Sequence, residues 1–312
     1  METVTESEFG SEEKFDSVPE DTGYVREEEF EATGPIEIDV AVGAGRIEVR
    51  LSERPGVRVA VRYDADASDQ WIPGLSGLLN WVSDQFGTPA QGSPDDAVRE
   101  TRIDLTGARL AVRTPKPLPM RGVPLAIVIE APNGSHVETK SGSASLVTTG
   151  SAGRLNVASG TGDVSVDRAD GVASVNSGSG AVRLGPMMGG VRVKSGSGDI
   201  EVSSVGGRSM LFTGSGDVWL GAVQSDVMVR TGTGDITVAD AACGAIELAT
   251  GSGELRVAVR SGTAAKVDLV SHAGQARSEL DVSSTPPAGN EPKLAIRGRT
   301  GSGDAVITTA VG

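Results

Sequence analysis

The sequence predicts an all-β protein: a parallel β-solenoid with 18-residue coils, preceded by a small antiparallel β-sheet region that carries one inserted amphipathic helix. Three observations lead to this fold class. A glycine-rich motif recurs at a constant spacing, alternating apolar segments follow it in each period, and the composition is rich in Gly (43 of 312 residues) but poor in aromatic residues (3%). Strands of Val, Ile, Leu and Ala joined by short glycine corners account for all three observations.

The repeated motif is clear in residues 159–166, which read Ser-Gly-Thr-Gly-Asp-Val-Ser-Val. Copies begin at residues 141, 159, 177, 195, 213 and 231, always at the same interval, and another begins at 250 after one extra residue near Cys243. The copy at 141 is degenerate, and a last copy begins at 300. A constant period over this many copies is the sequence signature of a solenoid.

Each period contains two short strands. In the first strand two apolar residues flank one mostly polar residue, as in Val164/Val166, Val182/Leu184, Ile200/Val202, Val218/Leu220, Ile236/Val238 and Leu255/Val257. The same alternation returns later in the period, and a period of two indicates a strand with one buried face. We therefore expect the coils to stack directly on one another as parallel sheets. A flattened roll and a triangular cross-section both fit a coil of this length.

The chain divides into four predicted parts. These are a disordered acidic N-terminal arm (1–32), a β-rich capping region with a helical insertion at about 71–87 (33–135), the solenoid (136–257), and irregular C-terminal strands with the final motif copy (258–312). The alternating segments of the capping region, 36–40, 46–50, 57–61, 102–112 and 125–129, predict a small antiparallel sheet that leads into the solenoid. Such a cap would protect the open sheet edge at the end of the stack.

The N-terminal arm carries most of the charge. Residues 1–31 contain twelve acidic residues against Lys14 and Arg26, which is −10 of the formal net charge of −14. This segment has too little apolar surface to offset the entropy cost of ordering, and either a solubilising tail or a docking tail for a basic partner fits its composition. Overall acidity, with no basic stripe interleaved with aromatic residues, argues against nucleic acid as a partner.

The insertion predicts an amphipathic helix that contains two of the three tryptophans. Apolar residues recur at helical spacing in Trp71, Leu75, Leu78, Val82 and Phe86, and Trp81 lies in the same segment. We consider three roles: capping the N-terminal sheet, docking into a partner groove, and contacting a membrane, for which the helix lacks Lys and Arg. Because no transmembrane segment or signal peptide is visible, we expect a cytoplasmic protein, with envelope association through partners as the alternative.

The coil motif Gly-Ser-Gly-Asp-Val, preceded by a β-rich leader with the entry sequence Ala131-Pro132-Asn133-Gly134, resembles a bacterial family of "putative adhesins". These β-strand repeat proteins are also called domain of unknown function 4097. The resemblance covers roughly residues 33–310. It implies a β-solenoid, no established enzymatic activity, and a role in adhesion or at the envelope. The family has no defined catalytic residues that could be transferred to this chain.

One column of acidic residues recurs at the coil corners. Its members are Asp163, Asp199, Asp217, Asp235 and Glu254, with Ala181 as a gap. Repeats of β-roll proteins bind calcium through acidic corners, so calcium is one hypothesis. Here only one acidic corner occurs per period, and carboxylates that accept hydrogen bonds from turn N–H groups explain the column without a metal. We favour this second explanation and predict no metal site and no cofactor.

The sequence offers little for catalysis. The Ser and Thr residues that begin each motif, such as Ser159 and Thr213, are predicted to form hydroxyl ladders, and the two histidines, His136 and His272, lie outside the motif. A serine nucleophile with its base, or a structural zinc site, is therefore not expected. A polysaccharide-active β-helix enzyme that uses paired carboxylates is the best enzymatic alternative, although the corners are uniformly short.

Exposed apolar residues are the stronger indication of function. Met210, Phe212 and Met228 fall on outward positions of adjacent coils, and Trp219 points outward from the other strand of its coil. Packing against the N-terminal region and a binding surface are the two explanations. We predict a non-enzymatic, adhesin-like scaffold that presents flat sheet faces to a protein or glycan partner. A regulatory protein of an envelope-stress pathway is a further alternative, suggested by the acidic arm and the Trp-bearing helix.

Overall fold

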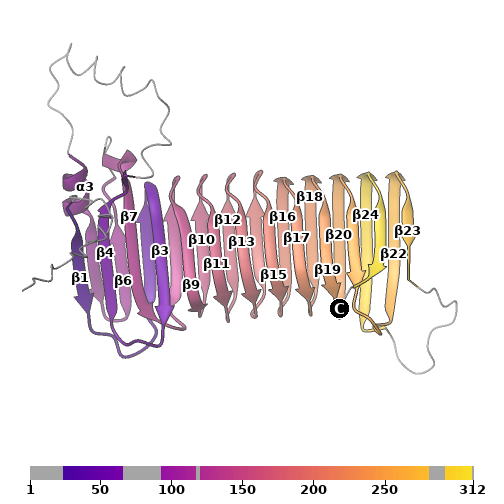
Figure 1. The fold of residues 1–312 in the computed structure, drawn as a ribbon, viewed down its shortest axis with the longest axis horizontal. Coiled ribbons are helices and arrows are strands. Elements are labelled where there is room, and N and C mark those ends of the chain that lie inside the picture. The colour runs from indigo at the N-terminus through magenta and orange to yellow at the C-terminus, as the bar shows by residue number, and fades with distance from the viewer. Residues whose placement is uncertain (1–23, 66–92, 117–119, 281–291, 311–312) are drawn as a thin grey trace, which may run out of the picture.

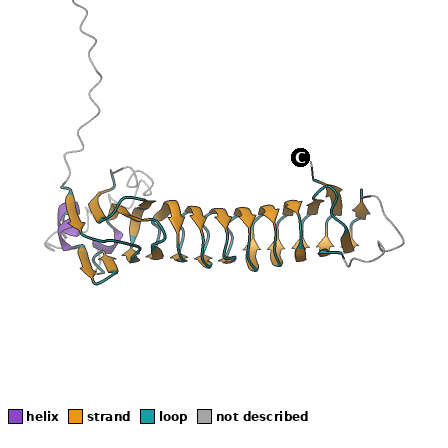
Figure 2. Ribbon diagram, turned by 90° about the horizontal axis from the view of Figure 1, so that it is seen from below, coloured by secondary structure: helices purple, strands orange, loops and turns teal. Residues whose placement is uncertain are grey.

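The computed structural model describes residues 24–65, 93–116, 120–280 and 292–310. In these residues two long β-sheets run the length of an elongated molecule (Figure 1). Figure 2 shows the two sheets as separate layers joined by the corners of successive coils. The cross-section is therefore a flattened two-sheet roll, one of the two forms compatible with an 18-residue period.

We call the 13-stranded layer sheet A and the 12-stranded layer sheet B. Sheet A contains, in spatial order, β1 (Arg26–Phe30), β4 (Val57–Tyr63), β7 (Pro124–Pro132), β3 (Ala44–Ser52), β9 (Ser145–Ala152), β11 (Val164–Ala169), β13 (Val182–Met187), β15 (Ile200–Val205), β17 (Val218–Val223), β19 (Ile236–Ala241), β21 (Leu255–Val259), β25 (Ala305–Thr309) and β23 (Ala276–Ser278). Sheet B contains β5 (Arg102–Thr106), β6 (Arg109–Arg113), β2 (Glu37–Val42), β8 (His136–Ser141), β10 (Leu155–Ser159), β12 (Ala173–Ser177), β14 (Val191–Ser195), β16 (Ser209–Ser215), β18 (Val227–Thr233), β20 (Gly244–Ser252), β24 (Leu294–Ser302) and β22 (Ala265–Ala273).

The coils stack in register, as the repeat predicts. Val164 lies beside Val182, and Val182 beside Ile200, in parallel pairs of adjacent strands. Each of these side chains is at most 1% exposed, because the inward faces of the two sheets pack against each other. The inward aliphatic residues of the coils form one continuous hydrophobic core along the molecule. This burial of apolar surface is the main stabilising contribution in a solenoid, since no coil can bury its inward face alone.

Glycine corners allow the coils to approach closely where the chain turns from sheet B to sheet A. A Cβ atom on Gly198 would lie 2.1 Å from the carbonyl oxygen of Gly180, and one on Gly180 would lie 2.2 Å from that of Gly162. Both distances are well below van der Waals contact. The second glycine of the motif is therefore required by the stacking of backbone on backbone.

The N-terminal end extends the solenoid beyond the predicted start at residue 136. β2 and β3 form a coil that lies between the β6–β7 coil and the β8–β9 coil, with parallel pairing on both sides. The antiparallel region is therefore smaller than predicted and consists of the β1–β4, β4–β7 and β5–β6 pairs. The reason is a glycine corner at Gly43-Ala44-Gly45, which stacks on the corner at Gly142 as the later motifs stack on each other.

The C-terminal end shows the same kind of insertion. β24 and β25 form a regular coil at the final motif copy predicted to begin at residue 300, and its corner at Gly301 stacks on the corner at Gly251. β22 and β23 then form the outermost coil, although they precede β24 in the chain. The two ends of the roll are therefore built alike. The coil β2–β3 is covered by β6–β7, and the coil β24–β25 is covered by β22–β23. In both cases the covering coil is formed from residues that lie further from the chain terminus.

The N-terminal third of the chain is ordered from an earlier residue than its composition predicts. The composition predicts disorder up to residue 32, but β1 pairs antiparallel with β4, so the ordered structure begins earlier. The aliphatic and aromatic side chains next to this pairing, such as Phe30, pack against the core and offset the entropy cost of ordering the strand. The helix predicted at about 71–87, with Trp71 and Trp81, lies outside the described residues.

The complete α-helix among the described residues is α3 (Pro94–Glu100), followed later by the 3-10 turn η1 (Met120–Gly122). Ser93 caps α3: its hydroxyl accepts from the backbone N–H of Asp96, whose carboxylate accepts from the N–H of Ser93. None of the helices in the described ranges is long and apolar enough to cross a membrane.

The close stacking at the corners generates a prediction. We expect Gly198→Ala to lower the free energy of unfolding by about 2 kcal/mol, because the new methyl group must push two coils apart. Gly34→Ala is the matched control, since a Cβ on Gly34 meets no atom within 4 Å, and we expect a change within about 0.5 kcal/mol. Urea denaturation followed by circular dichroism measures both. Equal stability of the two variants would contradict the stacking argument.

Candidate functional site

The outward face of sheet B carries an apolar patch at its centre. Met210 and Phe212 come from β16 and Met228 from β18, and Met210 lies directly beside Met228 in the parallel register. All three side chains are half-buried, and a shallow cleft of about 90 Å³ lies between the two methionines. The structure thus brings these three predicted residues together. They do not pack against the N-terminal strands, because β14, β12 and β10 separate β16 from β8 and from the strands of the N-terminal end.

Cations frame these apolar side chains. Arg192 lies beside Met210, Lys194 beside Phe212 on one side, and Arg230 beside Phe212 on the other. Within the described ranges none of the three cations forms an ion pair. We use the name sheet B patch for the six residues Arg192, Lys194, Met210, Phe212, Met228 and Arg230. It is a cationic and apolar surface on a chain with a net charge of −14.

Trp219 lies elsewhere. It belongs to β17 in sheet A, on the opposite face of the roll, and is 40% exposed. Its neighbours in the sheet are Glu201 and Thr237, and its ring lies over Gly221, where a Cβ would approach the ring edge to 3.1 Å. Trp219 is therefore separate from the sheet B patch, and the other two predicted interaction residues, Trp71 and Trp81, lie outside the described residues.

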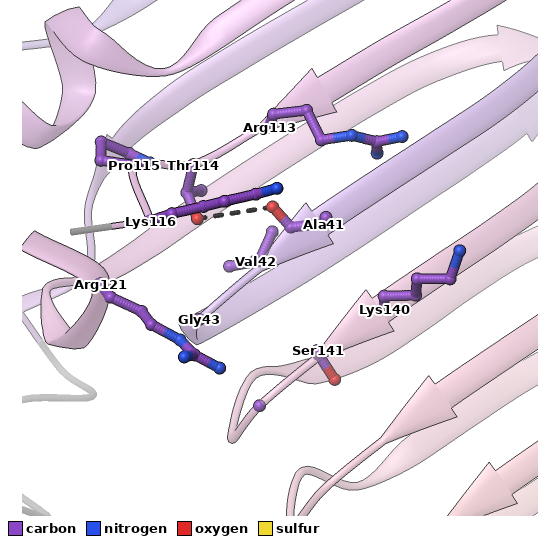
Figure 3. Close-up of a pocket in the computed structure, with 11 residues that line it drawn as sticks. Ala41, Val42, Gly43, Arg113, Thr114, Pro115, Lys116, Arg121, Lys140 and Ser141 are labelled. Atoms are coloured by element: carbon purple, nitrogen blue, oxygen red, sulfur yellow. Dashed lines mark hydrogen bonds between the residues drawn. The ribbon is translucent and has the colours of Figure 1, made fainter.

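A second surface feature was not predicted from the sequence. A cleft of about 360 Å³ opens at the N-terminal end of sheet B, where β2, β6 and β8 end near η1. Figure 3 shows Arg113, Lys116, Arg121 and Lys140 around it. We call this the basic cleft. Its signal in the sequence is the segment 113–121, which has three cations, three prolines and no acidic residue.

One wall of the basic cleft is held by an ion triad whose carboxylate is buried. Asp39, only 5% exposed, accepts hydrogen bonds of 2.7 Å from Arg113 Nη1 at Oδ1 and from Arg109 Nη2 at Oδ2. The hydrogen bonds from Arg113 and then Arg109 outweigh the effect of burial, and together they lower the pKa of Asp39 from 3.8 to about 2. The carboxylate therefore stays ionised, which orients the guanidinium of Arg113 at the edge of the cleft.

The acidic corner column forms a chain of hydrogen bonds. The Oδ1 atom of Asp199 accepts from the backbone N–H of Asp217 at 2.9 Å, Asp217 accepts from Asp235 at 2.8 Å, and Asp235 accepts from Glu254 at 2.7 Å. Asp163 likewise accepts from the N–H of Ala181. The four aspartates thus each satisfy a backbone donor of the next coil, as the explanation without a metal predicts, whereas Glu254 pairs with Arg256. The described residues contain no group of three or more His, Cys, Asp and Glu side chains that could hold a metal ion.

The Ser and Thr residues at the start of each motif face inward. Ser159 and Ser177 donate to glycine carbonyls of their own corners, whereas Thr213 and Thr231 donate to the carbonyls of Gly198 and Gly216 in the preceding coil. The predicted hydroxyl ladder is therefore mainly a set of bonds from hydroxyl groups to the backbone. One direct hydroxyl contact occurs, from Ser141 to Ser159 at 3.2 Å.

The histidines and the cysteine are far from one another in the sheets. His136 is on β8 and His272 on β22, which are separated by seven strands of sheet B, and His272 contacts the carbonyl of Thr300 at 3.4 Å. Cys243 donates from Sγ to the carbonyl of Gln224 at 3.3 Å. The structure does not bring these groups together into an arrangement for nucleophilic catalysis.

The fold and its surfaces define the class of protein: a two-sheet β-solenoid in which a regular aliphatic interior supports variable outward side chains. The model of the family described as Toastrack DUF4097 matches residues 126–309. This is more than half of the chain, which therefore belongs to that family. The resemblance identified from the coil motif is confirmed. A comparison with curated proteins found no match.

Solved structures show a more distant similarity. A "putative adhesin" from Bacteroides fragilis is 12% identical, with 91% of this chain and 97% of that chain covered and a TM-score of 0.37. A "putative adhesin" from Parabacteroides distasonis is 11% identical, with 92% and 98% covered and a TM-score of 0.33. A "putative lipid binding protein" from the same species is 12% identical, with 93% and 96% covered and a TM-score of 0.28. These scores are low, so the assignment depends on the family match.

The hydrogen-bonded acidic column generates a second prediction. Asp217→Ala removes the acceptor for the N–H of Asp235, and we expect the melting temperature to fall by about 2–4 °C. Asp217→Asn keeps an oxygen acceptor and should lose less than half as much. Differential scanning calorimetry in the presence of a chelator measures both variants. If Asp217→Asn were as damaging as Asp217→Ala, the charge and not the hydrogen bond would be the important feature.

The ion triad generates a third prediction. Because the pKa of Asp39 is lower in the folded protein than its ordinary value of 3.8, its ionisation stabilises the fold above about pH 4. We expect this contribution, about 2 kcal/mol at pH 7, to be lost as the pH falls from 4 to 2. Urea unfolding at each pH measures the effect. In Asp39→Asn the stability at pH 7 should be lower and its decrease below pH 4 shallower; an unchanged slope would contradict the prediction.

Proposed function

We propose that this protein is a non-enzymatic scaffold that binds a partner protein through the sheet B patch. The observation that carries the proposal is the position of Met210, Phe212 and Met228 in the middle of a sheet face that no described element covers. Adjacent strands of a sheet are about 4.8 Å apart, so these side chains form one continuous apolar area. Apolar and aromatic side chains surrounded by polar ones are typical of the energetically dominant centres of protein interfaces.

The charges around the patch favour an acidic partner. Arg192, Lys194 and Arg230 have no carboxylate partner among the described residues, so binding would supply their counter-charges. Two carboxylates line the cleft between the methionines: Asp226, which accepts from the N–H of Ala245, and Glu247, which lies beside Met228 on the side away from Arg192 and Lys194. A rigid sheet holds these side chains in place before binding, which reduces the entropy cost of association. An acidic segment with one or two apolar residues is the type of partner that fits this surface.

Several contacts support a binding role over the enzymatic alternative. The acidic column, which could have supplied paired carboxylates for glycoside cleavage, satisfies backbone donors of the next coil. The regular Ser and Thr hydroxyl groups donate inward to backbone carbonyls. These groups have structural roles in the coils, whereas the cations of the sheet B patch form no ion pair within the described ranges. A glycan partner and a regulatory role in an envelope-stress pathway are the alternatives: the first predicts that no protein is captured, and the second that the captured protein is a regulator.

A comparison of variants on the two faces tests the proposal. In the native host, we expect proteins captured by the full-length chain to be lost at least tenfold on combined replacement of Met210, Phe212 and Met228 with Ser. Trp219→Ser is the matched control, because it removes an exposed aromatic side chain from the opposite sheet. Quantitative mass spectrometry of co-purified proteins gives the readout, and melting temperatures check that the variants fold. Recovery of the same partners with the triple variant would disprove the proposal.

A further inference from the structure

The basic cleft combines a confined volume with an excess of positive charge. Arg113, Lys116, Arg121 and Lys140 line it, and no acidic side chain among the described residues does. Arg113 is paired with Asp39, and Lys140 is paired with Glu138 at 2.8 Å. Lys116 and Arg121 form no ion pair with any described residue, and both are exposed. Two positive charges at one location are therefore left without a counter-charge from the part of the chain that the structure describes.

Closely packed backbone forms the floor of the cleft. Gly43 and Gly142 lie at the stacked corners beneath it, and a Cβ on Gly142 would be 2.5 Å from the carbonyl oxygen of Gly43. The neighbouring corner donors are satisfied, since Gly142 N donates to Val42 O at 3.1 Å. In Figure 3 the side chains of Lys116 and Arg121 extend over this floor from one side, while Lys140 lies on the other. The cleft is thus a concave space with a glycine floor and cationic walls.

We propose that the basic cleft binds a phosphate monoester carried by a small organic molecule. Two uncompensated cations match the charge of a phosphate monoester, which is about −1.5 to −2 at pH 7. Lysine and arginine are the side chains that recognise phosphate in proteins, as a point charge and as a fork of donors. The volume of about 360 Å³ lies within the range of about 300–1,000 Å³ for small-molecule sites. Space therefore remains beside the phosphate for an organic group such as a sugar.

Arg113 and Lys140 have a different part in this site. Asp39 fixes the guanidinium of Arg113, and Glu138 pairs with Lys140, so both are oriented before the ligand arrives. Arg113 and Arg109 share the single carboxylate of Asp39, so this triad keeps one positive charge at the edge, whereas the Lys140–Glu138 pair is neutral. Lys116 and Arg121 contact the phosphate. The proposal is independent of the sheet B patch, because strands β10 and β12 lie between β8 at the cleft and β14 at the patch.

A graded series of ligands on one sugar tests the proposal. Isothermal titration calorimetry of the full-length protein at low ionic strength would use glucose 6-phosphate, glucose 6-sulfate and glucose as probes. We expect the dianionic phosphate to bind, the monoanionic sulfate to bind at least tenfold more weakly, and glucose not to bind. Equal affinity for the phosphate and the sulfate would contradict the proposal that two cations recognise a dianion. Equal affinity for glucose would show that the cleft is not an anion site.

Variants of exposed residues locate the site. Lys116→Ser combined with Arg121→Ser should weaken glucose 6-phosphate binding at least tenfold without changing the melting temperature. The matched control is Arg183→Ser combined with Arg297→Ser, which removes the same charge from β13 and β24 and should leave the affinity unchanged. Binding that survives the cleft variant, or that the control weakens equally, would overturn the proposal. Replacing Met210, Phe212 and Met228 should not affect this binding, so the two proposals can fail separately.

Discussion

The structure depends on one constraint, the direct contact between the backbones of successive glycine corners. Where Gly180 lies on Gly162 and Gly198 on Gly180, no side-chain atom fits between the coils. This contact brings the strands of both sheets to hydrogen-bonding distance and places Val164, Val182 and Ile200 in one file. The aliphatic core and the acidic hydrogen-bond chain both follow from it, because each requires equivalent residues to be one coil apart.

The interior of the roll is uniform, whereas its surface is free to vary. Outward positions of the same strands carry Arg192, Met210 and Met228 in one column and Lys194, Phe212 and Arg230 in the next. Changing these residues does not alter the corners or the core, so the scaffold can present different chemistry on a constant frame. Both the sheet B patch and the basic cleft are formed in this way from outward side chains and strand ends.

Sequence periodicity was sufficient for the central coils and insufficient at the ends. The motif and the alternating pairs predicted the parallel stack, the buried residues and the family. The position of β2 and β3 inside the solenoid was missed, because the single corner at Gly43-Ala44-Gly45 has no matching corner one period away in the chain. The basic cleft was missed for a related reason. Arg113 and Lys140 belong to separate segments of the sequence and come together only because β6 and β8 flank β2.

The order of the coils in space has a consequence for how the chain is completed during synthesis. β24 and β25 leave the ribosome after both of the coils between which they lie. The outermost coil, β22 and β23, is made before β24 and β25, the strands it pairs with in the finished roll. The spatial order of these last coils therefore differs from the order in which they are translated, and a product truncated just before β24 would contain the outermost coil without its native pairing partners.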